Sequence, residues 1–414
     1  MKSFLLLLKK HSREISNAKN RNISHSEQSY YIKIILILIL ILFFMSFNTY
    51  ISNLYYMNNE KIIESKEYKN FDKIRYETND PFILKILNRI SIIRHLFSEN
   101  IEKDKKGKHI IHITTSINNK KNYKYILLVQ MQSLLMACNK NSTFVIYHIL
   151  CSSDFNELST IIFKSLFISF SHNLEIIFYN MGYIPFHHKK IDINSVTNYR
   201  LLVPLFIHED RIIHLDSDCL IFVDLNEMFN LDFHDNYILG FYDVISNDVD
   251  YLGINSSTYI NAGITLLNLK KIRNDRKCFQ IIDLLNSNVK FTKEDQTILN
   301  YLLYPKIGRL PSKYGIFNFE DKSDLIIYLN ILRDKVPLNE LEDALKNPGI
   351  VHFVLCKPKP WYTNSLYFKE YTNCSQRLNC SCNKYFDIWH SIAKETYYYR
   401  KIAIFTGVRK KSLK

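Results

Sequence analysis

Apolar residues in the second quarter of the chain come in blocks whose spacing alternates between two periods. His109–Ile117 and Thr143–Cys151 are short apolar runs rich in β-branched residues, and residues 174–179 form a third run of this kind. Between them, residues 123–138 and 155–170 have apolar positions at helical spacing. Strands that alternate with helices build a parallel sheet covered by helices on both faces. The pattern therefore predicts an α/β domain whose first strand is the first of these runs.

A different pattern lies near the N-terminus, where residues 34–47 are apolar apart from Ser46. With its flanking residues this run reaches about 20 residues, which is long enough to span a bilayer. A cleaved signal peptide is disfavoured because a long segment precedes the run and no small-residue cleavage site follows it. Lys and Arg outnumber Glu in the preceding segment, which predicts a cytoplasmic N-terminus. We therefore expect a cytoplasmic tail (1–30), a transmembrane anchor (31–51), a stem (52–107) with a helical stretch at 81–97, and a lumenal domain in the ER or Golgi.

Composition narrows the class of protein. The 414 residues are 47% hydrophobic and 14% aromatic, which is enough to fill the core of a large domain. The formal charge is +14. Neither an Arg-rich helix nor a basic stripe interleaved with aromatics stands out, so we expect no nucleic-acid partner. A Gly-x-Gly-x-x-Gly fingerprint is also missing, which argues against a nicotinamide-binding enzyme.

The most informative polar motif is Asp216-Ser-Asp218, which follows the apolar run 212–215. Residues i and i+2 of a strand share a face, so the sequence predicts that both carboxylates point to one side and share a cation. Ligands of open α/β sheets bind beyond the carboxyl ends of the strands, where this pair falls. A second Asp-x-Asp triplet, Asp248-Val-Asp250, lies in a polar segment and has no such strand context.

Five ordered motifs resemble glycosyltransferase family 8. They are Ser195-Val-Thr-Asn-Tyr-Arg-Leu-Leu-Val-Pro204, Ile213-His-Leu-Asp-Ser-Asp218, Tyr259-Ile-Asn-Ala-Gly-Ile-Thr-Leu-Leu-Asn268, Glu294-Asp-Gln-Thr-Ile-Leu-Asn300, and Leu310-Pro-Ser-Lys-Tyr314 followed by Val351-His-Phe353 and Lys359-Pro-Trp361. The resemblance implies a Rossmann-like GT-A fold with a central mixed sheet over residues 108–370. It also implies a Mn²⁺ cofactor, a UDP-sugar donor and transfer with retention of configuration. The expected acceptor is a glycan, glycoprotein or glycolipid.

The resemblance adds His352 as a third metal ligand beside Asp216 and Asp218, and an imidazole among carboxylates suits manganese. Taken alone, this histidine is better explained as a buried core residue, and it is the flanking strand and the downstream Lys-Pro-Trp that favour a ligand. A lysine near the Lys-Pro-Trp motif is expected to contact the diphosphate. The loop is one residue longer than the family pattern, so both Lys357 and Lys359 are candidates.

Further donor contacts are implied at Arg200, Asn261, Ala262 and Gly263, and the candidate catalytic residues are Asp295 and Gln296. Each has a simpler reading. Arg200 would be unremarkable on a helix surface, Gly263 could serve a turn, and Asp295 could cap a helix.

The entry strand departs from the family pattern, because the usual acidic residue after it is missing. Tyr123 keeps the aromatic position, and Asn122, Asn118 or Ser116 could replace the lost hydrogen bond to the nucleotide. A catalytically silent relative that binds a nucleotide sugar or glycan therefore stays open as the alternative function.

The C-terminal extension, 371–414, is basic and contains Cys374, Cys380 and Cys382. A lumenal location would permit disulfides among them. The spacing does not match a zinc site.

Overall fold

The computed structural model describes residues 87, 90–96, 104–117, 123–152, 173–182, 195–243, 252–286, 291, 294–318, 322–354, 359–361 and 381–396. All of them belong to one compact unit, Asn70–Lys414. The expected tail and membrane anchor lie outside the described residues. Among the residues described, no helix is long and apolar enough to cross a membrane.

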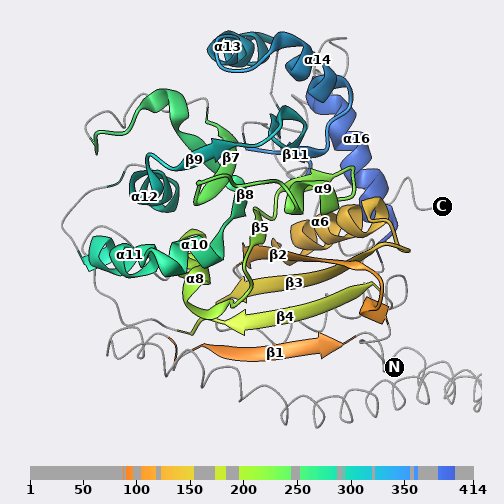
Figure 1. The fold of residues 1–414 in the computed structure, drawn as a ribbon. Coiled ribbons are helices and arrows are strands. Elements are labelled where there is room, and N and C mark those ends of the chain that lie inside the picture. Colours follow the sequence, from red (N-terminus) through yellow and green to blue (C-terminus); the bar gives the residue numbers. More distant parts are fainter. Residues whose placement is uncertain are drawn as a thin grey trace, which may run out of the picture. The chain divides into compact units, whose positions relative to one another are not determined.

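An eight-stranded mixed sheet with the order β1-β4-β3-β2-β5-β8-β7-β9 forms the centre of the fold (Figure 1). Its strands are β1 (Ser91–Leu96), β2 (His109–Ile117), β3 (Thr143–Cys151), β4 (Leu174–Asn180), β5 (Ile212–Leu215), β7 (Ile238–Tyr242), β8 (Ile260–Leu267) and β9 (Ile307–Arg309). The strands from β4 to β5 are parallel, whereas β8 runs antiparallel to both of its neighbours. The predicted mixed sheet is confirmed, as are the predicted strands β2, β3 and β4. The predicted helix at 155–170 lies outside the described residues.

One expectation about the N-terminal side of the domain was wrong. The stretch 81–97 was expected to be partly helical, but residues 91–96 form strand β1, which pairs antiparallel with β4. The sheet therefore includes a strand from the segment that was expected to be a stem. This strand could not be recognised from periodicity, because Ser-Ile-Ile-Arg-His-Leu fits a short helix as well as an edge strand.

A smaller sheet of three strands has the order β10-β11-β6, formed by Ile316–Phe317, Ile350–His352 and Cys219–Ile221. It pairs His352 with Cys219 across antiparallel strands and with Phe317 across parallel ones. The short strand β6 thus carries the chain out of the large sheet directly after the Asp-x-Asp motif. This change of sheet brings residues more than a hundred positions apart beside one another.

The described helices are α6 (Tyr123–Ala137), α8 (Val203–Phe206), α9 (Asn226–Phe229), α10 (Leu269–Asn274), α11 (Lys277–Asn286), α12 (Glu294–Leu303), α13 (Lys322–Leu332), α14 (Leu338–Lys346) and α16 (Ser381–Lys394), with the 3-10 helices η1 (Val196–Leu202), η3 (Ser256–Thr258) and η4 (Ser312–Tyr314). Helix α6 agrees with the predicted helix at 123–138 and is buried over most of its length. It contacts β6 on one side and α16 on the other. Helix α12 contacts β8 and η1. The two helices thus pack on different strands around the site, α6 against β6 and α12 against β8.

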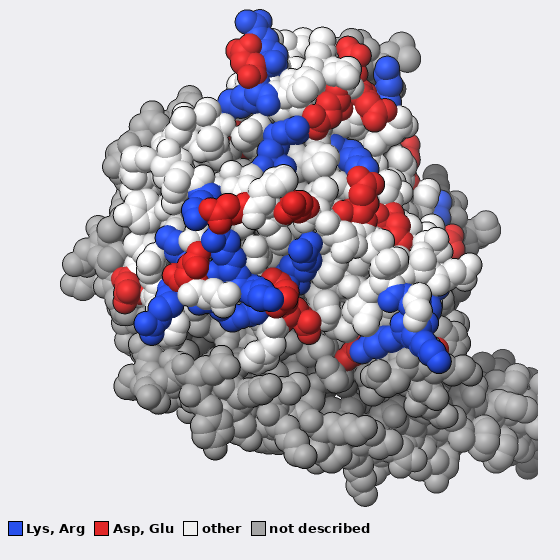
Figure 2. All heavy atoms as spheres, in the orientation of Figure 1, with Lys and Arg blue, Asp and Glu red and all other residues white. Residues whose placement is uncertain are grey.

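The face of the molecule drawn in Figure 2 carries basic and acidic side chains next to one another. Lys271 forms ion pairs with Asp235 and Asp275, and Lys306 pairs with Asp235 as well. The net positive charge of the chain therefore does not appear on this face as a uniform basic patch. The expected lack of a nucleic-acid partner stays a prediction.

Candidate metal and donor site

The Asp-x-Asp carboxylates lie at a bend between the two sheets. Strand β5 ends at Leu215 and β6 begins at Cys219, so residues 216–218 form a turn. The Asp216 N–H donates to the carbonyl of Gly263 at 2.7 Å, and the Phe353 N–H donates to the carbonyl of Asp218 at 3.0 Å. The prediction that both carboxylates share one face of a single strand was wrong. The change of sheet brings them together instead.

The structure places His352 between the two carboxylates. Its Nε2 lies 3.0 Å from Asp218 Oδ1 and 3.7 Å from Asp216 Oδ2. Lys359 Nζ lies 2.7 Å from the other oxygen of Asp218. His352 is only 2% exposed, yet it is not an apolar core histidine, because it faces two acidic side chains.

Arg200 holds Asp216 from the opposite side. Its Nη2 donates to Asp216 Oδ1 at 2.6 Å, its Nη1 to the carbonyl of Ala262 at 2.6 Å, and its Nε forms an ion pair with Asp295 Oδ2 at 2.9 Å. Arg200 is 5% exposed, so its reading as a surface helix residue is wrong. The guanidinium instead joins the metal motif, strand β8 and the start of α12. Asp295 thus does more than a simple helix cap would require, because it also pairs with this guanidinium.

Two other side chains complete the surroundings of Asp216. His214 Nε2 lies 3.4 Å from Asp216 Oδ1, and Gln130 of α6 donates from its side-chain amide to the backbone carbonyl of Asp216. Tyr147 in turn donates to Gln130 Oε1 at 2.7 Å, which fixes the orientation of the amide. Burial, reinforced by the charge of Arg200, lowers the pKa of His214 to about 4, so this ring is neutral near pH 7.

Both carboxylates are held in their charged form. Burial would raise the pKa of Asp216, but the charge of Arg200, the hydrogen bond from His214 and the charge of His352 outweigh it and hold that pKa well below its usual range. Burial opposes ionisation of Asp218 too, yet His352 and Lys359 lower its pKa to about 2. The site therefore presents two ionised carboxylates at neutral pH.

Gly263 is needed for the close approach of β8 to the site. A Cβ at this position would lie 2.2 Å from His352 Cε1 and 2.7 Å from Asp216 Oδ2. Its N–H donates to Asn261 Oδ1 at 2.9 Å, and Asn261 is buried. The simple reading as a turn glycine does not hold, because Asn261, Ala262 and Gly263 all lie inside β8. The small side chain makes room for the acidic and imidazole groups.

Gln296, near the start of α12, has a fixed orientation. Its Oε1 accepts from the Ala262 N–H at 3.1 Å, while its Nε2 donates to Asp243 Oδ2 at 2.5 Å and to the Tyr259 hydroxyl at 3.4 Å. Asp243 was not identified from the sequence. Its only signal was its place directly after the run 238–242, at the end of a strand, which is the position at which α/β sheets commonly carry functional residues.

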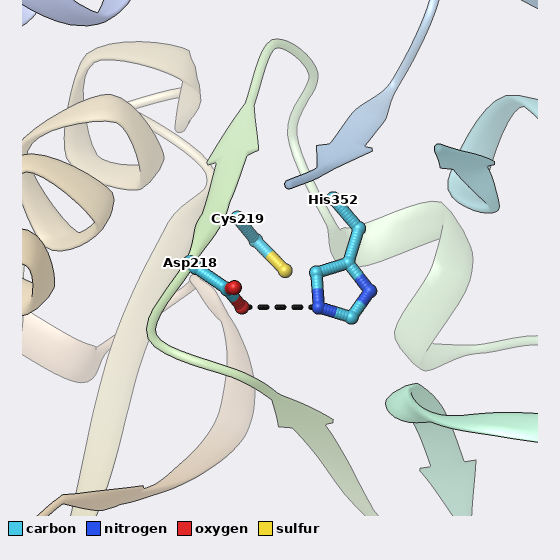
Figure 3. A group of neighbouring side chains, drawn as sticks. All are labelled: Asp218, Cys219 and His352. Atoms are coloured by element: carbon cyan, nitrogen blue, oxygen red, sulfur yellow. Dashed lines mark hydrogen bonds and ion pairs between the residues drawn. The ribbon is translucent and has the colours of Figure 1, made fainter. Parts of the chain in front are cut away.

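The possible ligand atoms of Asp218, His352 and a third residue, Cys219, all lie within 4.8 Å of one another (Figure 3). No sequence motif pointed to Cys219. Burial, followed by the charges of Asp218 and Asp216, raises the pKa of the Cys219 thiol well above its ordinary value. A thiol binds metals as the thiolate, so this side chain is a poor ligand. Figure 3 shows its sulfur beside the Asp218–His352 pair.

The oxygen and nitrogen donors fit a divalent cation. The 3.0 Å between His352 Nε2 and Asp218 Oδ1 matches the spacing of about 3.0 Å between adjacent ligands of an octahedral site with bonds of about 2.1 Å. Asp216 Oδ2 lies on the same side of the imidazole. His352 Nδ1 is buried without a hydrogen-bond partner among the described residues, so the ring is oriented by what Nε2 contacts. The three ligands expected from the sequence are therefore brought together.

The remaining candidates are less well placed. Tyr123 is 43% exposed at the start of α6, and Ser116 precedes it at the end of β2. Asn118, Asn122 and Lys357 lie outside the described residues, as do Cys374 and Cys380. Lys359 is thus the only one of the two lysines that the described part of the chain places against the acidic pair.

Fold and site together define an α/β domain whose cluster of carboxylates and an imidazole, with donors that fit a divalent cation, lies beyond the ends of its strands. The family model described as "Glycosyl transferase family 8" matches residues 114–365. The chain belongs to this family.

Curated relatives from Streptococcus pneumoniae serotype 4 (strain ATCC BAA-334 / TIGR4) match parts of the chain. Glycosyltransferase GlyB is 26% identical over 182 residues, which are 44% of this chain and 42% of GlyB. Glycosyltransferase GlyE is 29% identical over 170 residues, which are 41% of this chain and 38% of GlyE. The chain thus spans less than half the length of these relatives.

Among solved structures, the apo bifunctional glycosyltransferase WbbM is similar with a TM-score of 0.57 and 18% sequence identity. The match covers 71% of this chain and 51% of WbbM. This structural similarity shows that the two chains share a fold.

Proposed function

We propose that this chain transfers a sugar from a UDP-sugar donor to a glycan, glycoprotein or glycolipid, with Mn²⁺ as cofactor and with retention of configuration. The observation that carries the proposal is the cluster of Asp216, Asp218 and His352, with Lys359 beside it. Departure of UDP from a sugar leaves negative charge on a diphosphate. A cluster that combines cation ligands with a lysine is suited to that charge.

Each residue of the cluster has a distinct role in this proposal. Asp216, Asp218 and His352 would hold the cation, which when bound offsets charge on the departing diphosphate. Lys359 contributes a further positive charge at the same place. Arg200 keeps Asp216 ionised and directed toward His352, and it ties the metal motif to Asp295.

Asp295 and Gln296 are assigned to the donor hexose. Two fixed partners, the Ala262 N–H and Asp243, orient the amide of Gln296, so its polar edge is presented without a large cost in side-chain entropy. Asn261, Ala262 and Gly263 bring the backbone of β8 close to the same place. Tyr123 and Asn122 are assigned to the nucleoside.

Membrane anchoring completes the proposal. The apolar run at 34–47 and its basic flank support a type II membrane protein of the ER or Golgi with a lumenal catalytic domain. Protease added to sealed microsomes is expected to remove only the N-terminal tail. Digestion of residues 109–368 in intact vesicles would contradict this topology.

The alternative is a catalytically silent relative that binds a nucleotide sugar or glycan, and the missing acidic residue after β2 is the observation in its favour. Incubating the purified full chain in detergent with a panel of UDP-sugars, Mn²⁺ and glycan acceptors, and measuring released UDP, decides between the two. Sugar transfer with at least one donor supports the enzyme. Binding of UDP, or of a glycan alone, without turnover of any donor supports the silent relative, and binding of neither UDP nor any glycan contradicts both.

A further inference from the structure

The C-terminal helix α16 lies beyond the family-matched segment 114–365, yet it contacts the segments that flank the site. Tyr385 and Trp389 are four residues apart and so project from one face of the helix. The Tyr385 ring lies 6.2 Å from Phe222, which follows β6, and the Trp389 ring lies 5.8 Å from Trp361. One face of α16 therefore contacts both the residue that follows β6 and the Lys-Pro-Trp segment.

A row of buried rings continues from α16 to the metal ligands. Trp389, Trp361 and Phe353 are all at most 3% exposed. Trp361 packs edge-on against Phe353 at 5.7 Å, and Phe353 directly follows His352. Such contacts fix ring positions because the interior leaves little free volume. The position of Trp361 is thus set from both sides.

A hydrogen bond fixes the backbone between Lys359 and Trp361. His390 Nε2 lies 3.0 Å from the carbonyl oxygen of Pro360. A carbonyl only accepts, so Nε2 must carry the proton and donate. Burial lowers the pKa of His390, which keeps this ring neutral with a single proton for the bond. The residue next to Lys359 is therefore held by the helix directly.

This anchoring matters because a lysine has a long, flexible side chain. Its ammonium group can be held at one place only if its backbone is held first. Lys359 Nζ lies 2.7 Å from Asp218 Oδ2 and 5.5 Å from the centre of the Trp361 ring. Both contacts depend on where residues 359–361 lie, and α16 contacts this segment through Trp389 and His390.

We propose that α16 is the positioning element of the diphosphate-binding lysine, with His390 and Trp389 as positioning residues that act through the segment 359–361. The inference rests on the proposed function, because that function supplies the role of Lys359 in binding the diphosphate. It assigns part of the donor site to a helix outside the region that defines the family. A merely structural role for α16, which also packs against α6, is the competing explanation.

Binding of UDP with Mn²⁺, measured by calorimetry on the full chain, tests the coupling. His390→Ala should weaken binding roughly fivefold, the loss expected for one hydrogen bond, whereas His390→Gln keeps an N–H near the same place and should restore most of it. In a Lys359→Ala background, His390→Ala should have little further effect, because residues that act through one group are not additive. Ile392→Ala, a buried truncation on the same helix, is the control for destabilisation and should leave UDP affinity unchanged.

A second readout needs no nucleotide. Acetylation of lysines in the full chain, followed by mass spectrometry, reports the exposure of Lys359 relative to the exposed Lys394 on α16. His390→Ala and Trp389→Ala should raise the relative reactivity of Lys359 several-fold, while His390→Gln and Ile392→Ala should not.

The two readouts separate the possible failures. Unchanged Lys359 reactivity in both alanine variants, or an additive loss of UDP affinity in the Lys359→Ala background, overturns the positioning role. Raised reactivity in a chain that binds no UDP would uphold the anchoring of Lys359 and overturn the proposed function alone.

Discussion

The two carboxylates of the Asp-x-Asp motif are only two residues apart, but they belong to differently built halves of the site. The Asp216 half, which comprises Asp216, Arg200 and Asp295, is part of the large sheet and the helices packed on it. The Asp218 half, which comprises Asp218, His352 and Lys359, is assembled from segments 134 and 141 residues further along the chain.

The two halves differ in how much their contacts contribute to the stability of the fold. Arg200 is almost fully buried and has four polar partners, so the Asp216 half is tied into the core. Lys359 is 22% exposed and its ammonium group has a carboxylate partner that a bound cation would also contact. Substitutions in the Asp216 half should therefore reduce stability, whereas those in the Asp218 half should mainly reduce ligand binding.

Arg200→Ala is expected to have the largest effect on stability. Its removal leaves Asp216 and Asp295 without their shared counter-charge, and breaking a buried ion pair typically costs about 3–5 kcal/mol. Because the Asp216 side chain is 32% exposed, we expect a loss near about 3 kcal/mol in the free energy of unfolding, measured by urea denaturation. A loss below about 1 kcal/mol, the level of a surface ion pair, would show that the Asp216 half is not part of the structural core.

Lys359→Ala should behave in the opposite way. The free energy of unfolding should change little, while binding of UDP with Mn²⁺ should weaken by about 1.5–3 kcal/mol for the loss of a charged hydrogen bond. Lys357→Ala is the matched control and should cost much less. A larger loss of UDP affinity for Lys357→Ala would mean that the extra residue of the loop lies nearer Trp361 than His352. Lys357 would then contact the diphosphate, and the assignment of Lys359 would be wrong.

Gly263→Ala tests the boundary between the halves, because the new methyl group would meet both His352 and Asp216. Overpacking of this kind typically costs about 1–3 kcal/mol. Since the nearest atom belongs to the buried His352 ring, which must shift within the site, we expect a loss of about 2 kcal/mol in stability and a roughly tenfold loss in Mn²⁺ affinity. Unchanged Mn²⁺ affinity in a folded variant would show that His352 is not held against β8 as described.

The contacts of the Asp216 half were predicted from the sequence less well than those of the Asp218 half. This is so although the large sheet that carries the Asp216 half was predicted correctly. The strands β2, β3 and β4 followed from periodicity, because each is a short buried run. The network of Arg200 was missed because a single charged residue in the mixed segment 196–202 gives no sign of its burial. His352 and Lys359 were found through the family resemblance alone, because no local pattern indicates a contact over more than a hundred residues.

Two further features could not be predicted from the sequence, and in each case the cause is physical. The turn at 216–218 was read as a continued strand, because the apolar run resumes at Cys219 and a change of sheet leaves that pattern unaltered. Asp243 carries no motif of its own, and its role emerges only from its 2.5 Å hydrogen bond with Gln296. The anchoring by α16 likewise depends on ring contacts that no spacing rule predicts.

The central claim is that Asp216, Asp218 and His352 hold one divalent cation, and direct binding of Mn²⁺ to the full chain tests it most directly. Titration by calorimetry, with and without UDP, should give one site in the native chain. Asp218→Asn and Asp216→Asn should each lose Mn²⁺ binding and Mn²⁺-dependent UDP release, because the cation loses a charged ligand. Asp248→Asn, in the second Asp-x-Asp triplet, should leave both unchanged. Equal loss in all three variants, or full activity in the presence of a chelator, would contradict the account.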